Sequence, residues 1–365
     1  MNKLIYLDNA ATTPICNAAK EAIIRHLDDF GNPSSSYELG RQSRVIIEDA
    51  RERIAKCINA EANEIYFTSG GSEANTWALN DKISISSHFE HHSVKAHYNN
   101  VWIDRNGIVK PQFFRSINHS LAHYFEIMSC MYVNNEIGTI QPIKEVANIA
   151  HSKHMLFHTD AVQAAGYIPI DVKDLNCDML SASGHKFGAP KGIGFLYVKN
   201  CVHMKPLING GKQESGIRGG TENIIGIVSM AAALEDAVNH MAERNQKIAL
   251  LRNNLLDKLL RIPGSQLNGS LENRVPGNIN MRFDGVSGAK LVSLCSMYGV
   301  CISSGSACNE GISEPSHVLT AIGLTDEEAL NSIRITIGHE NTEEEINYAA
   351  DIITKLIERI RSDEE

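Results

Sequence analysis

Ser181-Ala182-Ser183-Gly184-His185-Lys186 puts a lysine just past the short apolar run Asp178-Met179-Leu180, which has the character of a strand. In an open α/β sheet, catalytic groups gather at the carboxyl ends of the strands. A lysine held there, beside small hydroxyl residues and a histidine, suits Schiff-base chemistry, because its neutral amine can attack an aldehyde. Taken alone, an ordinary solvated surface lysine is the more common explanation.

A second strand end carries an acid. Met155-Leu156-Phe157-His158-Thr159 has the pattern of a short buried strand, and Asp160 follows it directly, with Gln163 close behind. A carboxylate there can pair with the protonated pyridine nitrogen of pyridoxal phosphate and keep that cofactor an electron sink. Such an acid is usually only a helix cap. A strand-end aspartate and a strand-end lysine together are much less common by chance.

A third strand, Glu64-Ile65-Tyr66-Phe67-Thr68, leads into the turn Ser69-Gly70-Gly71-Ser72-Glu73-Ala74-Asn75, which begins a helix. Glycines let the backbone approach an anion, and a helix N-terminus presents free N–H groups with partial positive charge. A lone glycine turn is more often a simple connection. Together with the other two strand ends, this turn predicts a phosphate-binding site.

These residues resemble the cysteine desulfurases of the class V aminotransferase superfamily, which are pyridoxal phosphate enzymes of fold type I. The resemblance covers nearly the whole chain, in the family's order. It includes Tyr6-Leu7-Asp8-Asn9-Ala10-Ala11-Thr12-Thr13-Pro14, Phe30-Gly31-Asn32-Pro33-Ser34, Glu90-His91-His92-Ser93-Val94, Val133-Asn134-Asn135-Glu136-Ile137-Gly138, Gly184-His185-Lys186-Phe187-Gly188 and Ser332-Ile333-Arg334-Ile335.

Within that superfamily, Ser303-Ser304-Gly305-Ser306-Ala307-Cys308 indicates a desulfurase. A cysteine on a small, polar, glycine-containing segment is accessible and can travel, as a sulfur-transferring nucleophile must. The competing interpretation is a buried packing cysteine, which the Ser-Ser-Gly surroundings disfavour. The segment is similar to the longer loop of desulfurases of the iron–sulfur-assembly type.

The resemblance implies a role for each site residue. Lys186 holds pyridoxal phosphate as a Schiff base, Asp160 pairs with its pyridine nitrogen, and Arg334 binds the substrate carboxylate through its planar fork. Cys308, Lys186 and His91 are the expected catalytic residues, with His91 stacked on the ring and assisting proton transfer. The remaining cofactor-binding residues are Gln163 and Asn135 near the ring hydroxyl, Gly71, Ser72, Ser183 and His185 at the phosphate, and Thr221 at the phosphate of the neighbouring subunit; Asn135 is also expected to contact substrate.

The implied activity is that of a sulfurtransferase. L-Cysteine becomes L-alanine, and its sulfur stays on Cys308 as a persulfide until an acceptor protein, an iron–sulfur scaffold or a thiolation factor, takes it. The expected assembly is a homodimer. A selenocysteine lyase or another class V enzyme is the nearest alternative, and a non-catalytic sulfur-relay or complex-forming protein is an alternative of a different class.

Composition agrees with this interpretation. The chain has 365 residues, 43% of them hydrophobic, and a formal net charge of −9, which speaks against a nucleic-acid or membrane-surface partner. The N-terminal apolar run is too short for a signal peptide, and no apolar stretch reaches transmembrane length, so we expect a cytoplasmic protein. The eight cysteines form no CxxC pair, and the histidines around residues 88–97 complete no zinc motif, so we expect no metal.

Strand-like segments alternate with helical ones, as at 125–133, 143–154, 155–159 and 178–182, which predicts a parallel sheet with covering helices. The resemblance implies an α/β fold, with a large domain over residues 15–255 that contains a mainly parallel seven-stranded sheet. A small α+β domain over residues 1–14 and 256–365 is expected to carry the cysteine loop. Between them lies a strongly helical run over residues 224–261.

Overall fold

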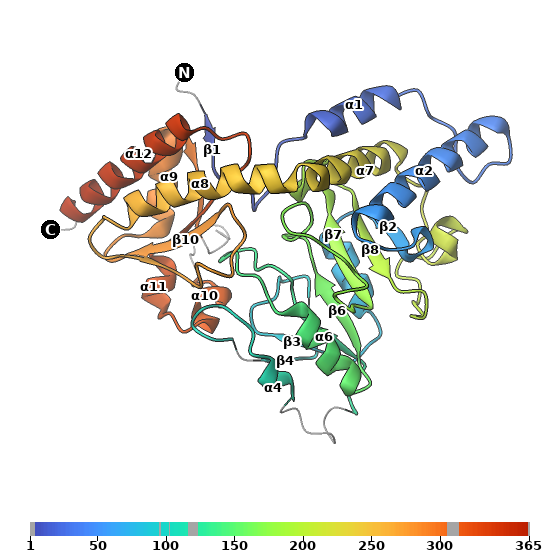
Figure 1. The fold of residues 1–365 in the computed structure, drawn as a ribbon, viewed down its shortest axis with the longest axis horizontal. Coiled ribbons are helices and arrows are strands. Elements are labelled where there is room, and N and C mark those ends of the chain that lie inside the picture. Colours follow the sequence, from blue (N-terminus) through green and yellow to red (C-terminus); the bar gives the residue numbers. More distant parts are fainter. Residues whose placement is uncertain (1–3, 95, 102, 116–122, 305–313, 364–365) are drawn as a thin grey trace.

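The computed structural model describes residues 4–94, 96–101, 103–115, 123–304 and 314–363 (Figure 1). A seven-stranded sheet dominates the larger lobe, with the strand order β2-β8-β7-β6-β5-β3-β4. β8 is antiparallel to both of its neighbours, and the other pairings are parallel. The prediction of an α/β fold with a mainly parallel seven-stranded sheet is therefore confirmed. The strands are β2 Ile65–Thr68, β3 Ser84–Ser87, β4 Tyr98–Val101, β5 Ile127–Ser129, β6 Leu156–Asp160, β7 Met179–Ser183 and β8 Gly194–Val198.

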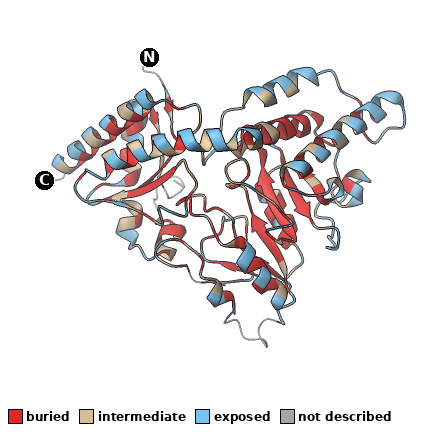
Figure 2. Ribbon diagram, in the orientation of Figure 1, coloured by how far each residue is buried: buried red, intermediate tan, exposed pale blue. Residues whose placement is uncertain are grey.

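Helices cover this sheet, which explains why β7 and β8 are buried at every residue (Figure 2). α7 is buried along most of its length, because its sequence is almost entirely apolar, and α1 and α2 pack on it. The helices of this lobe are α1 Asn17–Arg25, α2 Glu38–Cys57, α3 Gly71–Leu79, α4 Pro111–Arg115, α6 Ile143–Ser152 and α7 Ile224–Asn239.

The helical run over residues 224–261 is not one helix. α7 ends at Asn239, α8 spans Met241–Leu259, and their axes are bent by 71°. The bend lies at His240, whose backbone angles (φ −106°, ψ 9°) are not helical. Arg244 pairs with Asp236 across the break at 2.8 Å. The bend lets α8 leave the large sheet and pack against the smaller lobe (Figure 1).

The smaller lobe contains a four-stranded antiparallel sheet in the order β12-β13-β10-β9. β1 and β11 form a separate parallel pair. α12 begins with a capping box, in which Thr342 and Glu345 each satisfy the other's backbone N–H. The elements are β1 Ile5–Tyr6, β9 Ser265–Leu267, β10 Asn278–Phe283, β11 Val300–Cys301, β12 Ser303–Ser304, β13 Ser332–Thr336, α8, α9 Gly288–Met297, α10 His317–Ala321, α11 Asp326–Leu330 and α12 Glu343–Ser362.

Two segments pass between the lobes. Ile5 and Leu7 belong to the hydrophobic core of the smaller lobe, and the chain then crosses to the large lobe, where the backbone N–H of Thr13 donates to His185 O. In the other direction, Val318 and Leu319 of α10 are buried in the core of the large lobe. Both crossings border the carboxyl edge of the large sheet, where the candidate site lies.

Candidate active site

A cavity of about 510 Å³ opens at the carboxyl edge of the large sheet. β2, β6 and β7 run in one direction and end here, so the glycine turn, Asp160 and Lys186 come together as their strand-end positions indicated. The predicted site residues that line this cavity are Gly71, Ser72, His91, Asn135, Asp160, Gln163, Ser183, His185, Lys186 and Arg334.

Two predicted residues are not among them. Thr221 is exposed and lines a separate, smaller pocket, which shares Ser69 and Gly192 with the main cavity. Thr221 thus lies next to the glycine turn but outside the main cavity. Cys308 lies outside the described residues, between β12 and α10.

Lys186 follows β7 on a short 3-10 turn, Gly184–Lys186. Its Nζ donates to two backbone carbonyls of the N-terminal segment, Ala10 O at 2.6 Å and Ala11 O at 2.8 Å. Burial, with help from the positive charge of Arg334, lowers the pKa of Lys186 to about 8. The lysine is therefore held in place with an amine that loses its proton much more readily than an exposed lysine does.

Asp160 ends β6 and is almost fully buried. Its Oδ1 accepts from the backbone N–H of Val162 at 2.9 Å, and its Oδ2 accepts from Asn75 Nδ2 at 2.6 Å. Burial raises the pKa of Asp160, while these donors and the nearby Lys186 act against that increase. A positively charged ring nitrogen placed against this carboxylate would favour its ionised form.

The glycine turn packs closely against its neighbours at the start of α3. A Cβ added to Gly71 would lie 2.5 Å from Val162 Cγ2, so no side chain fits there without displacement of its neighbour. Glu73 turns back to accept from the N–H of Ser69 at 2.7 Å and pairs with Arg218 at 2.9 Å. Gly71, Ser72 and Glu73 line the cavity, so the N-terminus of α3, where backbone N–H groups lack helical partners, lies at the cavity wall.

His185 also lines this cavity. Its Nδ1 lies 3.1 Å from Thr12 Oγ1. Burial, together with Lys186 and Lys191, lowers the pKa of His185 to about 4. The ring is neutral at pH 7.

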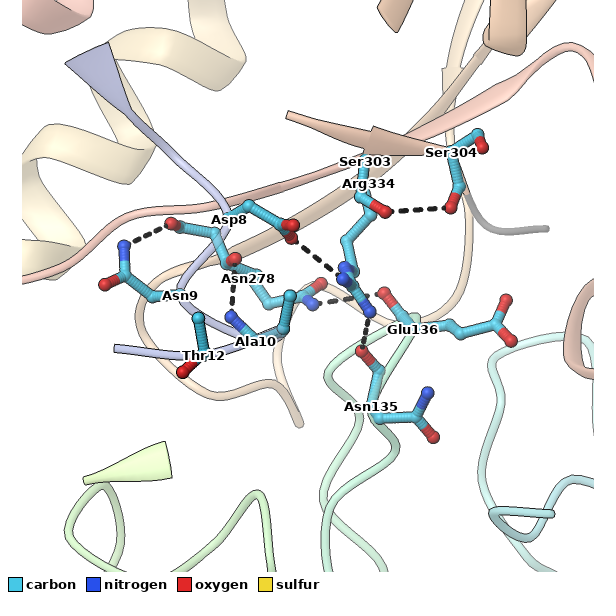
Figure 3. Close-up of polar contacts among 12 residues, drawn as sticks. Asp8, Asn9, Ala10, Thr12, Asn135, Glu136, Asn278, Ser303, Ser304 and Arg334 are labelled. Atoms are coloured by element: carbon cyan, nitrogen blue, oxygen red, sulfur yellow. Dashed lines mark hydrogen bonds and ion pairs between the residues drawn. The ribbon is translucent and has the colours of Figure 1, made fainter. Parts of the chain in front are cut away.

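Arg334 of β13 reaches the cavity from the smaller lobe (Figure 3). One of its terminal nitrogens donates to Asp8 Oδ1 at 2.8 Å and the other donates to Asn135 O at 2.9 Å. Its Nε is buried and has no hydrogen-bond partner among the described residues. The guanidinium is thus oriented from both sides and keeps further N–H groups for a ligand.

Gln163 does not bind a side chain of the cavity. Its Nε2 donates to Ala10 O at 2.9 Å, so Gln163 and Lys186 hold the same carbonyl. His91, in the segment after β3, lines the cavity and has Ser93 Oγ 2.7 Å from its Nδ1.

Sequence reasoning missed several residues that build this site. Asn75 and Ser93 line the cavity and hold Asp160 and His91, and Asp8 orients Arg334. Asn75 lies four positions after Gly71, on the same face of α3, and this spacing was a signal that could have found it.

The chain that follows residues 305–313 is fixed to the wall of the cavity region. Ser316 Oγ donates to Glu136 Oε2 at 2.5 Å, and burial raises the pKa of Glu136 to about 7. The ring of His317 lies against that of His92, with the centroids 4.6 Å apart. Both anchors join α10 to segments that carry cavity residues, Asn135 and His91.

The fold and the site define a class of protein. A parallel-rich sheet with a strand-end lysine, a buried strand-end aspartate and a helix N-terminus around one cavity is the arrangement of a pyridoxal phosphate enzyme. The model of the aminotransferase class-V family matches residues 5–348. The chain belongs to this family.

Relatives that align over nearly the whole chain narrow this family to the cysteine desulfurases, which depend on pyridoxal phosphate. The chain is 41% identical to "Cysteine desulfurase IscS" of Methanosarcina thermophila, over 99% of this chain and 94% of the relative. It is 42% identical to "Cysteine desulfurase IscS" of Clostridium botulinum strain Hall, over 99% and 96%. A solved NifS-like protein from Rickettsia africae is 31% identical, with a TM-score of 0.88 over 99% of this chain and all of that one. A second structure, titled "SspA in complex with cysteine", is 34% identical, with a TM-score of 0.78 over 93% of this chain and all of that one.

The described part of the chain contains neither a metal-binding cluster nor a single membrane-spanning helix. No group of three or more His, Cys, Asp or Glu side chains there is arranged to hold a metal ion. No single helix of these residues is long and apolar enough to cross a membrane. Taken together, α7 and α8 are long and apolar enough by length and composition alone, but a 71° bend lies between them.

Proposed function

We propose that Lys186 carries pyridoxal phosphate covalently, that Arg334 binds the carboxylate of L-cysteine beside it, and that Cys308 takes the substrate sulfur. The observation that carries the proposal is the meeting of Lys186, Asp160 and Arg334 in one cavity, with the Lys186 amine made less basic by burial. The activity of the family, desulfuration of cysteine, fits this set of groups.

The residues present fit the cofactor. The glycine turn and the N-terminus of α3, both on the cavity wall, suit its phosphate through free backbone N–H groups. Asp160 suits the protonated ring nitrogen, because a buried carboxylate gains most from a cationic partner. When bound, pyridoxal phosphate would withdraw electrons from the Cα of the substrate cysteine, and this would make the substrate sulfur electrophilic enough for attack by a thiolate.

The protein groups then have separate tasks. The neutral Lys186 amine takes the proton from Cα, since its lowered pKa leaves an appreciable neutral fraction at pH 7. Arg334 holds the carboxylate by charge-assisted hydrogen bonds, while Asp8 and Asn135 keep its fork in place. Cys308 accepts the sulfur as a persulfide, leaving alanine, and passes it to an acceptor protein.

We also propose that the chain acts as a homodimer with shared sites. Large apolar side chains are exposed along α1, α2 and the segment between them, where Phe30 is 80%, Ile24 70% and Val45 68% exposed. Such a run is unusual on a monomer surface and supports burial against a second copy. Thr221, exposed beside the glycine turn, is the proposed contact to the partner's phosphate group.

The cellular setting and acceptor follow from the chemistry. All seven described cysteines are unpaired, which supports a reducing compartment such as the cytoplasm. The acceptor is proposed to be a sulfur-receiving protein of iron–sulfur assembly or of thiolation. A selenocysteine lyase is the nearest alternative, and the co-product, sulfide or selenide, separates the two.

The test of the lysine uses two residues of the same cavity. After reduction with borohydride, peptide mapping is expected to find the cofactor on Lys186. Lys186→Ala should abolish this linkage, whereas Lys191→Ala, which alters another lysine of the cavity lining, should keep it. A label on any lysine other than Lys186 contradicts the assignment.

The test of the cysteine separates the two halves of the reaction. Cys308→Ser should bind pyridoxal phosphate and change its visible spectrum with L-cysteine, yet release no alanine, because a serine hydroxyl is not an adequate nucleophile at neutral pH. The matched control is Cys201→Ser, which alters an exposed cysteine. Mass spectrometry should find one extra sulfur on the Cys308 peptide; normal alanine release by Cys308→Ser would show that this assignment is wrong.

The test of the dimer is sedimentation at assay concentration. Dissociation should weaken cofactor binding as well as halve the mass. A fully active monomer contradicts shared sites.

A further inference from the structure

A chain of hydrogen bonds joins Asp160 to His91 through two residues that have no role in the proposal above. Asn75 Nδ2 lies 2.6 Å from Asp160 Oδ2 and 2.9 Å from Ser93 Oγ. Ser93 Oγ in turn lies 2.7 Å from His91 Nδ1, and the backbone N–H of Ser93 donates to the same nitrogen at 3.1 Å. The chain connects β6, α3 and the segment after β3.

The direction of each hydrogen bond follows from what the groups can donate. An ionised carboxylate only accepts, so one hydrogen of the Asn75 amide points to Asp160 and the other points to Ser93 Oγ. The opposite orientation of the amide would put its oxygen against the carboxylate. Ser93 Oγ therefore accepts from Asn75 and has its own hydrogen left for His91 Nδ1.

His91 Nδ1 thus accepts from two donors, the Ser93 hydroxyl and the Ser93 backbone N–H. A nitrogen with two donors aimed at it carries no hydrogen, so the ring proton lies on Nε2. Among the described residues, Nε2 has no hydrogen-bond partner, and the ring lines the cavity.

The surroundings of the ring favour its neutral state on balance. Loss of hydration lowers the pKa of His91 below its ordinary value, and His92 and Lys186 act in the same direction, whereas Asp160 favours the cation. His317, on α10, also interacts electrostatically with His91.

We propose that Asn75 and Ser93 are positioning residues that hold His91 as the neutral Nε2–H tautomer, so that the ring offers the bound cofactor and substrate a hydrogen-bond donor instead of a base. The inference deepens the proposed function and rests on it for the ligand. It leaves Lys186 as the base of the site.

The experiment is nitrogen NMR of the protein labelled with ¹⁵N-histidine, with and without pyridoxal phosphate. The His91 signals are assigned by their loss in His91→Asn. Wild type should give an Nε2 shift typical of a protonated ring nitrogen and an Nδ1 shift typical of an unprotonated one. An Nδ1 that carries the proton in wild type would overturn the proposal.

Variants of Ser93 test the relay itself. Ser93→Ala removes one of two donors to the neutral ring, so the pKa of His91 should rise by about one pH unit and the second tautomer should appear. Ser93→Thr keeps a hydroxyl and should restore the wild-type shifts. Ser152→Ala, which removes a distant hydroxyl bonded to Ile149 O at 2.7 Å, is the matched control and should change nothing at His91.

Asn75 gives a second, independent measurement. Asn75→Leu, whose side chain is of similar size and has no polar atoms, cannot donate to Ser93, which frees the serine hydroxyl to rotate away from His91. The His91 shifts should then move in the same direction as in Ser93→Ala. Asn75 is buried, and if this variant does not fold, the partly exposed Ser93 still decides the question.

The NMR result is separable from the activity. A protein that fails to bind pyridoxal phosphate or to form alanine contradicts the proposed function but leaves the tautomer measurable in the cofactor-free protein. Unchanged His91 shifts in both Ser93→Ala and Asn75→Leu would overturn the relay, even in an enzyme that is fully active.

Discussion

The pKa of Lys186 predicts how fast the cofactor-free protein takes up pyridoxal phosphate at different pH. Only the neutral amine attacks the aldehyde. Burial and Arg334 lower the pKa of Lys186 from 10.5 to about 8. At pH 7 the amine is then neutral in about one molecule in ten, against about one in three thousand for an unperturbed lysine, a difference of roughly 300-fold.

The sign of the effect gives the shape of the pH profile. Because the pKa is lowered, the amine is half neutral at about pH 8 instead of at pH 10.5, and nearly all of it is neutral about one pH unit higher. The rate of covalent linkage, followed by visible absorbance, should therefore rise about tenfold per pH unit up to about pH 8 and then level off. Free Nα-acetyl-lysine in the same buffers is the control for ionisation of the cofactor, and its rate should keep rising to above pH 10.

A substitution tests the cause of the lowered pKa. Arg334→Gln removes a positive charge that opposes protonation of Lys186, so the levelling-off should move to higher pH. A wild-type profile that rises without a break to pH 10 would refute the reasoning, because it would mean that the site does not depress the lysine.

Three further predictions concern binding and stability. Arg334→Lys should raise KM for L-cysteine by about 10- to 100-fold, because lysine lacks the planar fork that binds a carboxylate; steady-state kinetics measure this, and an unchanged KM would assign the carboxylate to another residue. Gly71→Ala should weaken cofactor binding by at least about tenfold, since the new Cβ meets Val162 Cγ2 at 2.5 Å; a fluorescence titration measures it, and adding Val162→Ala should recover affinity if the clash is the cause. Glu214→Ala removes two hydrogen bonds of the buried Arg51, of 2.9 and 2.8 Å, and leaves it Glu48 and Ile65 O as partners. The variant should lose about 3–5 kcal/mol in urea unfolding, so a loss below about 1 kcal/mol would contradict a structural role for this pair.

The strand-end positions were predictable because they depend on local sequence. Lys186 and Asp160 each follow a short apolar run, and parallel strands deliver both to one edge of the sheet. The sheet itself was predictable for the same reason.

Other features depend on contacts between distant segments, which no local pattern reports. Asn75 looks like any polar helix residue until β6 brings Asp160 to it, and Asp8 binds Arg334 from 326 positions away. The break at His240 was missed because no proline or glycine marks it; the only local signal is that Val238, Asn239 and His240 are weaker helix formers than the residues around them.

The contact between Asp8 and Arg334 sets a time order for folding on the ribosome. The N-terminal segment, whose Ala10 and Ala11 carbonyls hold the Lys186 amine, is among the first to be synthesised. β13 is among the last; its Thr336 forms a β-bridge with Asp8, and it supplies Arg334. Such non-local pairing has to wait until both partners exist. A nascent chain can therefore form the large sheet early, but the core of that lobe also needs Val318 and Leu319 of α10, and the cofactor pocket is completed only after β13 has left the exit tunnel. Termination before α10 thus leaves a sheet without its full core and without a finished site.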